Sequence, residues 1–281
     1  MSRRPSRARP NRPGRPGASP PVLAVVGLTV AAMAFIGLIG GAVMLQRATV
    51  GIDPVTLCPR SGPTALTAIL LDVTDPLSPV QRAAVLVRLN KIVANLRLDE
   101  EIAVYSIDPS TDPLKSALVV CRPMKPGEVN ELTGNKALAQ RRFVQIFEPK
   151  VNALLAAAMD RPQSEHSPIM EAIQAVAVTY FQAADAASRT GPLPKRLIIV
   201  SDMLENAAGG SHYRGVPDFA AYRASAAYAR VRSHLGGIKV IILYLRRDTR
   251  LPIQGRSHIQ FWDDWFADQG ATVEDVYAIE G

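Results

Sequence analysis

Acidic residues are missing from the first 21 positions, and this absence accounts for most of the chain's positive charge. The formal net charge is +7, but six arginines lie in this segment, so the rest of the chain carries only +1. A nearly neutral remainder excludes a broad basic groove for nucleic acid, whose phosphates must be neutralised on binding. The segment is rich in Arg, Pro, Ser and Gly, which predicts a disordered basic tail over residues 1–21. Its arginines are Arg3, Arg4, Arg7, Arg9, Arg12 and Arg15.

Charged residues of either sign are absent from Val22 to Leu45. A bilayer core needs about 20 apolar helical residues, which this run supplies. A helix packed on a globular core would show a polar face, which this run lacks. A cleaved signal peptide would have an apolar region of about 7 to 15 residues before a small-residue cleavage site, which is shorter than this run. We therefore predict an uncleaved transmembrane signal anchor over residues 22–45. The arginines before it place the amino terminus in the cytoplasm and the carboxyl-terminal part outside, as a single-pass inner-membrane protein with a periplasmic or extracytoplasmic domain.

Small residues within this span suggest a contact between two such helices. Gly37 and Gly41 form a GxxxG pattern, which lets two membrane helices approach closely. A dimer through this span is therefore an expectation.

Cysteine is scarce, with two residues in the whole chain. Cys58 lies in a Pro- and Gly-containing linker over residues 46–63, and Cys121 ends an apolar run. In an extracytoplasmic compartment two cysteines favour a disulfide, so we predict the Cys58–Cys121 bond; two buried free thiols are the alternative.

Signatures of catalysis are also missing. The four histidines show no metal-ligand spacing, and Ser201 follows an apolar run without the Gly-x-Ser-x-Gly elbow that exposes a nucleophile. A haloacid dehalogenase-like phosphotransferase would need a second acid where the chain has Thr74. We expect no enzyme, and a Mg²⁺-dependent phosphoryl-transfer enzyme is the alternative from another class.

Strand-like and helix-like segments alternate from residue 64 to residue 281. The link 108–113 is too short for a crossover helix, so the strand after it should be antiparallel to the one before it. This order predicts one α/β domain over 64–281: a doubly wound, mainly parallel six-stranded sheet with one antiparallel edge strand and helices on both faces. Strands are expected at 64–73, 101–107, 116–121, 196–200, 238–245 and 273–279, and helices at 79–98, 136–159, 168–187, 218–235 and 260–269.

Two of the expected strands end in carboxylates and hydroxyls. The apolar run before Asp72 stops at Asp72, Thr74 and Asp75, and a later run stops at Ser201 and Asp202. Ligands of open α/β sheets collect at the carboxyl ends of strands. These two ends are therefore the first place to expect a binding site.

The order of these motifs resembles a known pattern. Asp72-Val-Thr74 follows a buried strand, Ser167 precedes a predicted helix, and Ser201-Asp202 ends a later strand, which is similar to the metal-ion-dependent adhesion site of von Willebrand factor A domains. The resemblance implies that Asp72, Thr74, Ser167 and Asp202 hold a divalent cation, Mg²⁺ first, with a vacancy for an acidic group of a protein partner.

One position departs from that pattern. Pro76 stands where the family has its second Ser and offers no side-chain ligand. Asp75 would replace the missing ligand or cap the following helix. Because of Pro76, a metal-free scaffold that uses the same face is an alternative.

Two further segments bear on the function. The long loop Glu205 to Pro217 carries Tyr213 and Arg214, residue types enriched at binding hot spots, and we predict that they contact a partner. Trp262, Trp265 and Phe266 have helical spacing and are expected to pack in the core. The sequence thus predicts a membrane-anchored extracytoplasmic protein-binding or scaffolding module in a cell-envelope complex, with no nucleic acid and no small-molecule substrate.

Overall fold

The computed structural model of the chain describes residues 26, 30–41, 51–72, 74–107, 114, 116–130, 134–159, 164, 166–188 and 191–281. It divides into two compact units, Met1–Gly51 and Ile52–Gly281. In the first unit residues 30–41 are helical and include Gly37 and Gly41. Among all described residues, no helix has both the length and the apolar character needed to cross a membrane. The predicted tail and much of the predicted span Val22 to Leu45 lie outside the described residues.

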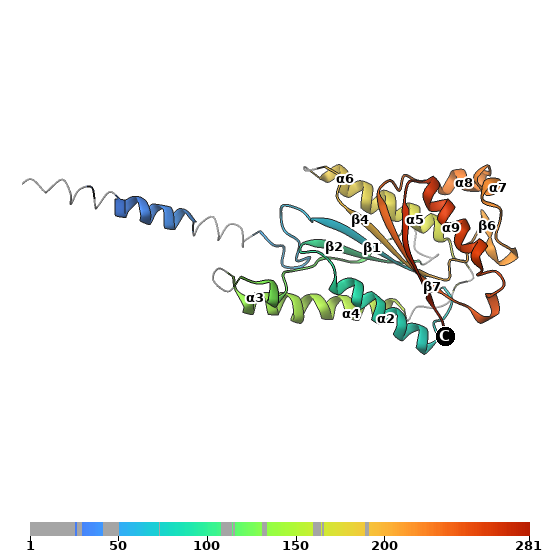
Figure 1. Cartoon of the computed structure of the whole chain (residues 1–281), viewed down its shortest axis with the longest axis horizontal. Helices are drawn as coiled ribbons and strands as arrows, with labels where there is room; N and C mark the ends of the chain where they lie inside the picture. The colour runs from blue at the N-terminus through green and yellow to red at the C-terminus, as the bar shows by residue number, and fades with distance from the viewer. Residues whose placement is uncertain are drawn as a thin grey trace, which may run out of the picture. The chain divides into compact units, whose positions relative to one another are not determined.

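The second unit is built on a six-stranded sheet (Figure 1). The strand order is β3-β2-β1-β4-β7-β8, in which β3 is antiparallel to β2 and the other neighbouring pairs are parallel. The predicted doubly wound sheet with one antiparallel edge strand is confirmed. The strands are β1 (Ala65–Leu71), β2 (Glu100–Ser106), β3 (Ser116–Cys121), β4 (Lys195–Ser201), β7 (Ile238–Leu245) and β8 (Thr272–Ile279).

Central strands are apolar along their whole length because both faces of the sheet are covered. Every residue of β1 is buried. Leu66, Ala68 and Leu70 pack into the core on one face, whereas Ile69 and Leu71 pack into the core on the other. The alternation of side chains along a strand thus sends one apolar run into two cores.

Helices cover the two faces (Figure 1). One face carries α2 (Pro79–Ala94) and α4 (Glu148–Ala158), and the other carries α5 (Ile169–Val176), α8 (Ala226–Val231) and α9 (Arg256–Asp268). The core role predicted for the α9 aromatics is confirmed, because Trp262, Trp265 and Phe266 are at most 1% exposed. Both faces of the sheet are therefore closed, and the strand ends remain as the place for a site.

Three expectations need correction. The helix predicted over 218–235 is two short helices, α7 (Phe219–Arg223) and α8, because the Ser225 side chain accepts a hydrogen bond from Tyr228 N and starts a new helix. The loop after β4 contains a small hairpin, β5 (Asn206–Ala207) and β6 (Gly210–Ser211). The predicted helices 136–159 and 168–187 contain wider π-type turns. The segments concerned are α3 (Lys136–Gln140), η2 (Arg141–Phe147) before α4, and η3 (Ala177–Gln182) with α6 (Ala183–Ala187) after α5.

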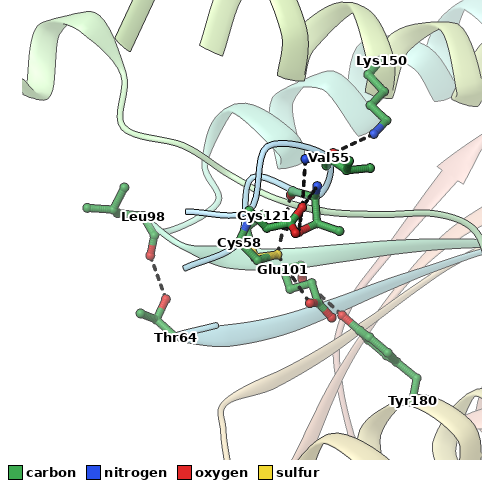
Figure 2. The surroundings of a disulfide bond; sticks show 10 residues. Val55, Cys58, Thr64, Leu98, Glu101, Cys121, Lys150 and Tyr180 are labelled. Atoms are coloured by element: carbon green, nitrogen blue, oxygen red, sulfur yellow. Dashed lines mark hydrogen bonds between the residues drawn. A yellow bond between two sulfur atoms is a disulfide. The ribbon is translucent and has the colours of Figure 1, made fainter. Parts of the chain in front are cut away.

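A disulfide joins Cys58 to Cys121, as predicted (Figure 2). It lies at the amino-terminal end of the parallel strands, because Cys121 pairs with Glu101 near the start of β2. The linker before β1 packs against this end: Cys121 N donates to Thr56 O at 2.8 Å, and Lys150 Nζ donates to Val55 O at 3.0 Å. Glu101 Oε2 lies 3.6 Å from Cys58 Sγ, but the bonded sulfurs leave no thiolates for a metal. The disulfide is thus at the opposite end of the sheet from Asp72.

Candidate functional site

The polar strand ends meet at the carboxyl end of the sheet. Asp72 directly follows β1 and Asp202 directly follows β4, and these two strands are parallel neighbours. Asp72 N donates to Val200 O at 2.9 Å, which fixes the start of one loop against the end of the other strand. Ser167 precedes α5 and is tied to the loop after β4 through a hydrogen bond from its N–H to Asn206 O at 3.0 Å. Three separate segments therefore bring their polar groups to one place.

Asp72 is the centre of this cluster. Its Oδ2 accepts hydrogen bonds from Ser167 Oγ at 3.0 Å and from Ser201 Oγ at 2.7 Å, and its Oδ1 accepts from Thr74 Oγ1 at 2.8 Å. The carboxylate is buried, at 3% exposure, and a buried charge needs such donors because water is excluded. Each hydroxyl donates its hydrogen bond to Asp72, and its oxygen can still accept from or coordinate another group.

Asp202 has a different environment. Its Oδ1 accepts a hydrogen bond from Leu204 N at 2.9 Å, and its Oδ2 accepts from Arg247 Nε at 3.1 Å. Burial, and next the negative charge of Asp72, raise the pKa of Asp202. The Leu204 N–H and the Arg247 guanidinium lower this pKa and oppose part of the shift. The two carboxylates therefore repel one another across a buried site.

Arg247 connects the two loops of the site. Besides the ion pair with Asp202, its Nη1 donates to the carbonyl oxygen of Pro76 at 2.7 Å, and its Nη2 donates to that of Asp75 at 3.4 Å. Pro76 thus contributes its backbone, at the position where the family pattern has a serine side chain. Arg247 follows β7 and is a residue of this site that the motif comparison did not identify.

Asp75 and Tyr213 lie beside the cluster. The cap interpretation of Asp75 is wrong, because Ser78 caps α2 and its side chain accepts from Gln81 N at 3.1 Å. Asp75 Oδ2 instead accepts a hydrogen bond from the Tyr213 hydroxyl at 3.3 Å. Burial, and then the carboxylates of Asp202 and Asp75, raise the pKa of Tyr213, so this phenol is a hydrogen-bond donor at neutral pH.

The rim of the site consists of partly exposed side chains. Tyr213 and Asp75 are half-buried, Arg214 is exposed, and the Arg250 guanidinium lies 4.7 Å above the centre of the Tyr213 ring. The loop predicted to contact a partner therefore borders the predicted metal ligands, although Arg214 itself is not within the cluster of hydrogen bonds described above.

Ser201 is not placed as a nucleophile. Its hydroxyl is fully buried, donates to Asp72 and accepts a hydrogen bond from Met203 N at 2.7 Å. The nearby His212 contacts His258, with 3.1 Å between His212 Nδ1 and His258 Nε2. These contacts do not assemble a serine triad.

Sequence reasoning missed two supporting residues. A charged residue that follows a buried strand is the signal that identified Asp72, and Arg247 has the same signal. Its neighbour Arg246 has that signal too, and only the structure shows that Arg247 is the one that contacts Asp202. Gln254 is fully buried, and its Nε2 donates to Asp202 O at 3.0 Å and to Leu245 O at 2.8 Å while its Oε1 accepts from Arg247 N at 2.7 Å. No sequence pattern points to it.

The donor chemistry of the cluster fits a hard divalent cation. Carboxylate and hydroxyl oxygens are the ligands that Mg²⁺ prefers, and a cation would relieve the repulsion between Asp72 and Asp202. Asp72, Thr74, Ser167 and Asp202 would hold it. The Arg247 guanidinium and the missing hydroxyl at Pro76 are the two features that separate this cluster from an ordinary site of that kind.

Comparisons with known proteins add the following. No protein-family model matches the chain, and no curated protein sequence matches it. Similar solved structures include proximal thread matrix protein 1 from the mussel byssus, at 10% identity and a TM-score of 0.37 over 78% of this chain and 42% of that one. The ArnB paralog VWA2 from Sulfolobus acidocaldarius is similar at 10% identity and a TM-score of 0.36, over 77% of this chain and 41% of that one. An aerotolerance-related membrane protein from Bacteroides fragilis shows 10% identity and a TM-score of 0.32, over 76% and 91%.

These similarities concern the fold alone. A second structure of the mussel protein, at 13% identity and a TM-score of 0.36, has a zinc-occupied MIDAS motif. The chain spans less than half the length of the mussel and Sulfolobus proteins. The strand order with its one antiparallel edge strand, together with the three motifs that meet at the carboxyl end of the sheet, resembles the arrangement of a von Willebrand factor A domain.

Proposed function

We propose that the domain is a protein-binding or scaffolding module of a cell-envelope complex and that its partner docks on the carboxyl end of the sheet. The observation that carries this proposal is the convergence of two buried carboxylates and three hydroxyls from separate segments, bordered by a loop with Tyr213 and Arg214. A cluster of this kind costs folding energy through buried charge, and binding is the function that such a cost would serve.

The proposal includes a divalent cation, with Mg²⁺ as the first candidate. When bound, it would offer a coordination position to a carboxylate of the partner, because Mg²⁺ is usually held by one or two protein carboxylates and takes other ligands from outside. Asp72 and Asp202 supply the charge, and Thr74 and Ser167 supply neutral oxygens. The Asp75 carboxylate, which accepts a hydrogen bond from Tyr213, is the further candidate ligand.

The setting of the domain is also proposed. The uncharged run Val22 to Leu45 and the arginines before it support a single membrane anchor with an extracytoplasmic domain. Gly37 and Gly41 support a dimer of that anchor. The disulfide agrees with an oxidising compartment, in which such bonds persist. We expect no catalytic activity, since the buried Ser201 and the arrangement of His212 do not support a nucleophile and base.

Crosslinking in native membranes tests the proposed function. The full-length chain is expressed as wild type, Asp72→Asn and Asp275→Asn, and partners are captured by a carboxyl-selective crosslinker. Asp275 is an exposed residue on β8 and serves as the matched control. We expect Asp72→Asn to lose a partner that wild type and Asp275→Asn retain, with normal thermal unfolding in all three proteins. Equal capture by all three would show that this cluster is not the binding site.

A further inference from the structure

The two departures from the metal-site pattern contact one another. Pro76 lacks the hydroxyl that the pattern requires, and its carbonyl oxygen is the acceptor of the shortest hydrogen bond that the Arg247 side chain makes, at 2.7 Å. The same guanidinium holds Asp202 Oδ2 at 3.1 Å. A positive group therefore connects the loop after β1 with the loop after β4, the two loops that carry Thr74 and Asp202, which are both expected metal ligands.

The position of Arg247 is built into the fold. Its backbone N–H donates to Gln254 Oε1, and Gln254 is fixed in turn by the carbonyl oxygens of Asp202 and Leu245. The Arg247 side chain is 14% exposed and its Asp202 partner is 6% exposed, so water screens this ion pair little. Arginine suits this role because its planar fork of donors can hold a carboxylate and a carbonyl oxygen together, which a lysine ammonium does less well.

We propose that Arg247 is the resident cation of this site and that a divalent metal ion binds only by displacing its guanidinium from Asp202. This inference rests on the cation site of the proposed function, but it does not depend on the partner. Arg247 balances one of the two buried carboxylates, and it holds the two loops in place without metal. At low concentrations of the divalent ion, the Arg247 guanidinium therefore stays on Asp202 and no metal ion is bound.

Direct metal titration tests this inference. The purified full-length chain is titrated with Mg²⁺ by calorimetry and with Mn²⁺ by the electron paramagnetic resonance signal of the free ion. Wild type is compared with Arg247→Gln and with Lys239→Gln. Lys239 is an exposed residue near the start of β7, at the other end of the sheet, so its variant removes one positive charge away from the site and is the matched control. We expect Arg247→Gln to bind either ion more tightly than wild type by roughly tenfold, which is within the usual range for coupled sites, and Lys239→Gln to bind as wild type.

Two further variants keep the inference falsifiable. Arg247→Gln combined with Asp202→Asn should lose the gain in affinity, because the freed carboxylate is its source. If Arg247→Gln does not fold, Arg247→Lys keeps the charge and should give a smaller gain in the same direction.

Thermal unfolding supplies a second readout. Mg²⁺ should raise the melting temperature of Arg247→Gln more than that of wild type, since at one ligand concentration a ligand that binds more tightly stabilises the folded state more. Metal affinity in Arg247→Gln that is equal to or weaker than in wild type, or absent from both, would overturn the inference. Loss of partner capture alone would bear on the proposed function and leave these titrations unaffected.

Discussion

Glu205 should make the stability of this domain fall as the pH rises. Its side chain is 5% exposed, and its Oε2 accepts a hydrogen bond from Met170 N at 3.0 Å, at the start of α5. Burial raises the pKa of Glu205 to about 8 from an ordinary 4.5; the Met170 N–H lowers it, and the charges of Glu171 and Asp72 raise it further. The folded state therefore binds the proton more tightly than the unfolded state does.

The sign follows from linkage. A group with a raised pKa in the folded state contributes stability that is fully present below its unfolded pKa and is lost as the pH rises through its folded pKa. For Glu205 the window runs from about pH 4.5 to about pH 8. Between pH 5 and pH 9 this one carboxyl should remove about 4 kcal/mol from the free energy of unfolding, since each pKa unit is worth about 1.4 kcal/mol.

Urea unfolding of wild type and Glu205→Gln across this pH range measures the effect. The glutamine can still accept the bond from Met170 N, so the variant should fold, and its stability should exceed that of wild type increasingly as the pH rises. Asp263→Asn is the matched control, because Asp263 is exposed on α9 and its replacement should leave the slope nearly unchanged. Parallel curves for wild type and Glu205→Gln would refute the reasoning and show that Glu205 is already ionised in the folded domain.

Two other perturbations have definite expectations. Replacing both Cys58 and Cys121 by serine opens a loop with a sequence separation of 63, which should lower the free energy of unfolding by about 4 kcal/mol on the chain-entropy model. Denaturant unfolding measures this loss of stability, and a loss below about 1 kcal/mol would contradict the prediction. Alkylation of the wild-type cysteines should shift the mass only after reduction, whereas labelling without reduction would mean free thiols. Burial, then the neighbouring His258, lowers the pKa of His212 to about 3. The stability that is present above pH 6.5 should therefore fall by roughly 2 to 3 kcal/mol between pH 7 and pH 4.5. His212→Phe should remove that part of the acid sensitivity in thermal melts, and an unchanged acid midpoint would count against a neutral buried imidazole.

The sheet was predictable because its strands are buried on both faces. An apolar run such as β7 (Ile238–Leu245) has the same limits in the sequence and in the structure. The short link before β3 also fixed the antiparallel direction of that strand on geometric grounds. Breaks within helices were harder to predict. Ser225 caps α8 by accepting the hydrogen bond from Tyr228 N, but serine also occurs in unbroken surface helices. The sequence alone therefore did not reveal the division of α7 from α8.

The polar cluster was predictable only in part. Asp72, Thr74 and Asp202 follow apolar strands, and the edge at which parallel strands end was enough to place them near one another. Ser167 required the resemblance to a known pattern. The partners that decide the electrostatics, Arg247 and Gln254, come from the segment after β7, and their inward direction depends on tertiary hydrogen bonds that no local pattern encodes.

Pro76 has a different meaning once Arg247 is placed. Considered alone, a proline at a ligand position signals a degraded metal site, and the remaining carboxylates would be left with excess buried charge. Considered with Arg247, the same proline supplies a carbonyl oxygen to a guanidinium that also neutralises Asp202, so the two residues together replace what the missing hydroxyl and a bound cation would do. Under the proposed displacement of Arg247, a site of this composition keeps its loops in place without metal and offers oxygen ligands once the guanidinium has left Asp202. The proposed affinity for a cation, and for a partner that needs one, then depends on how firmly Arg247 holds Asp202.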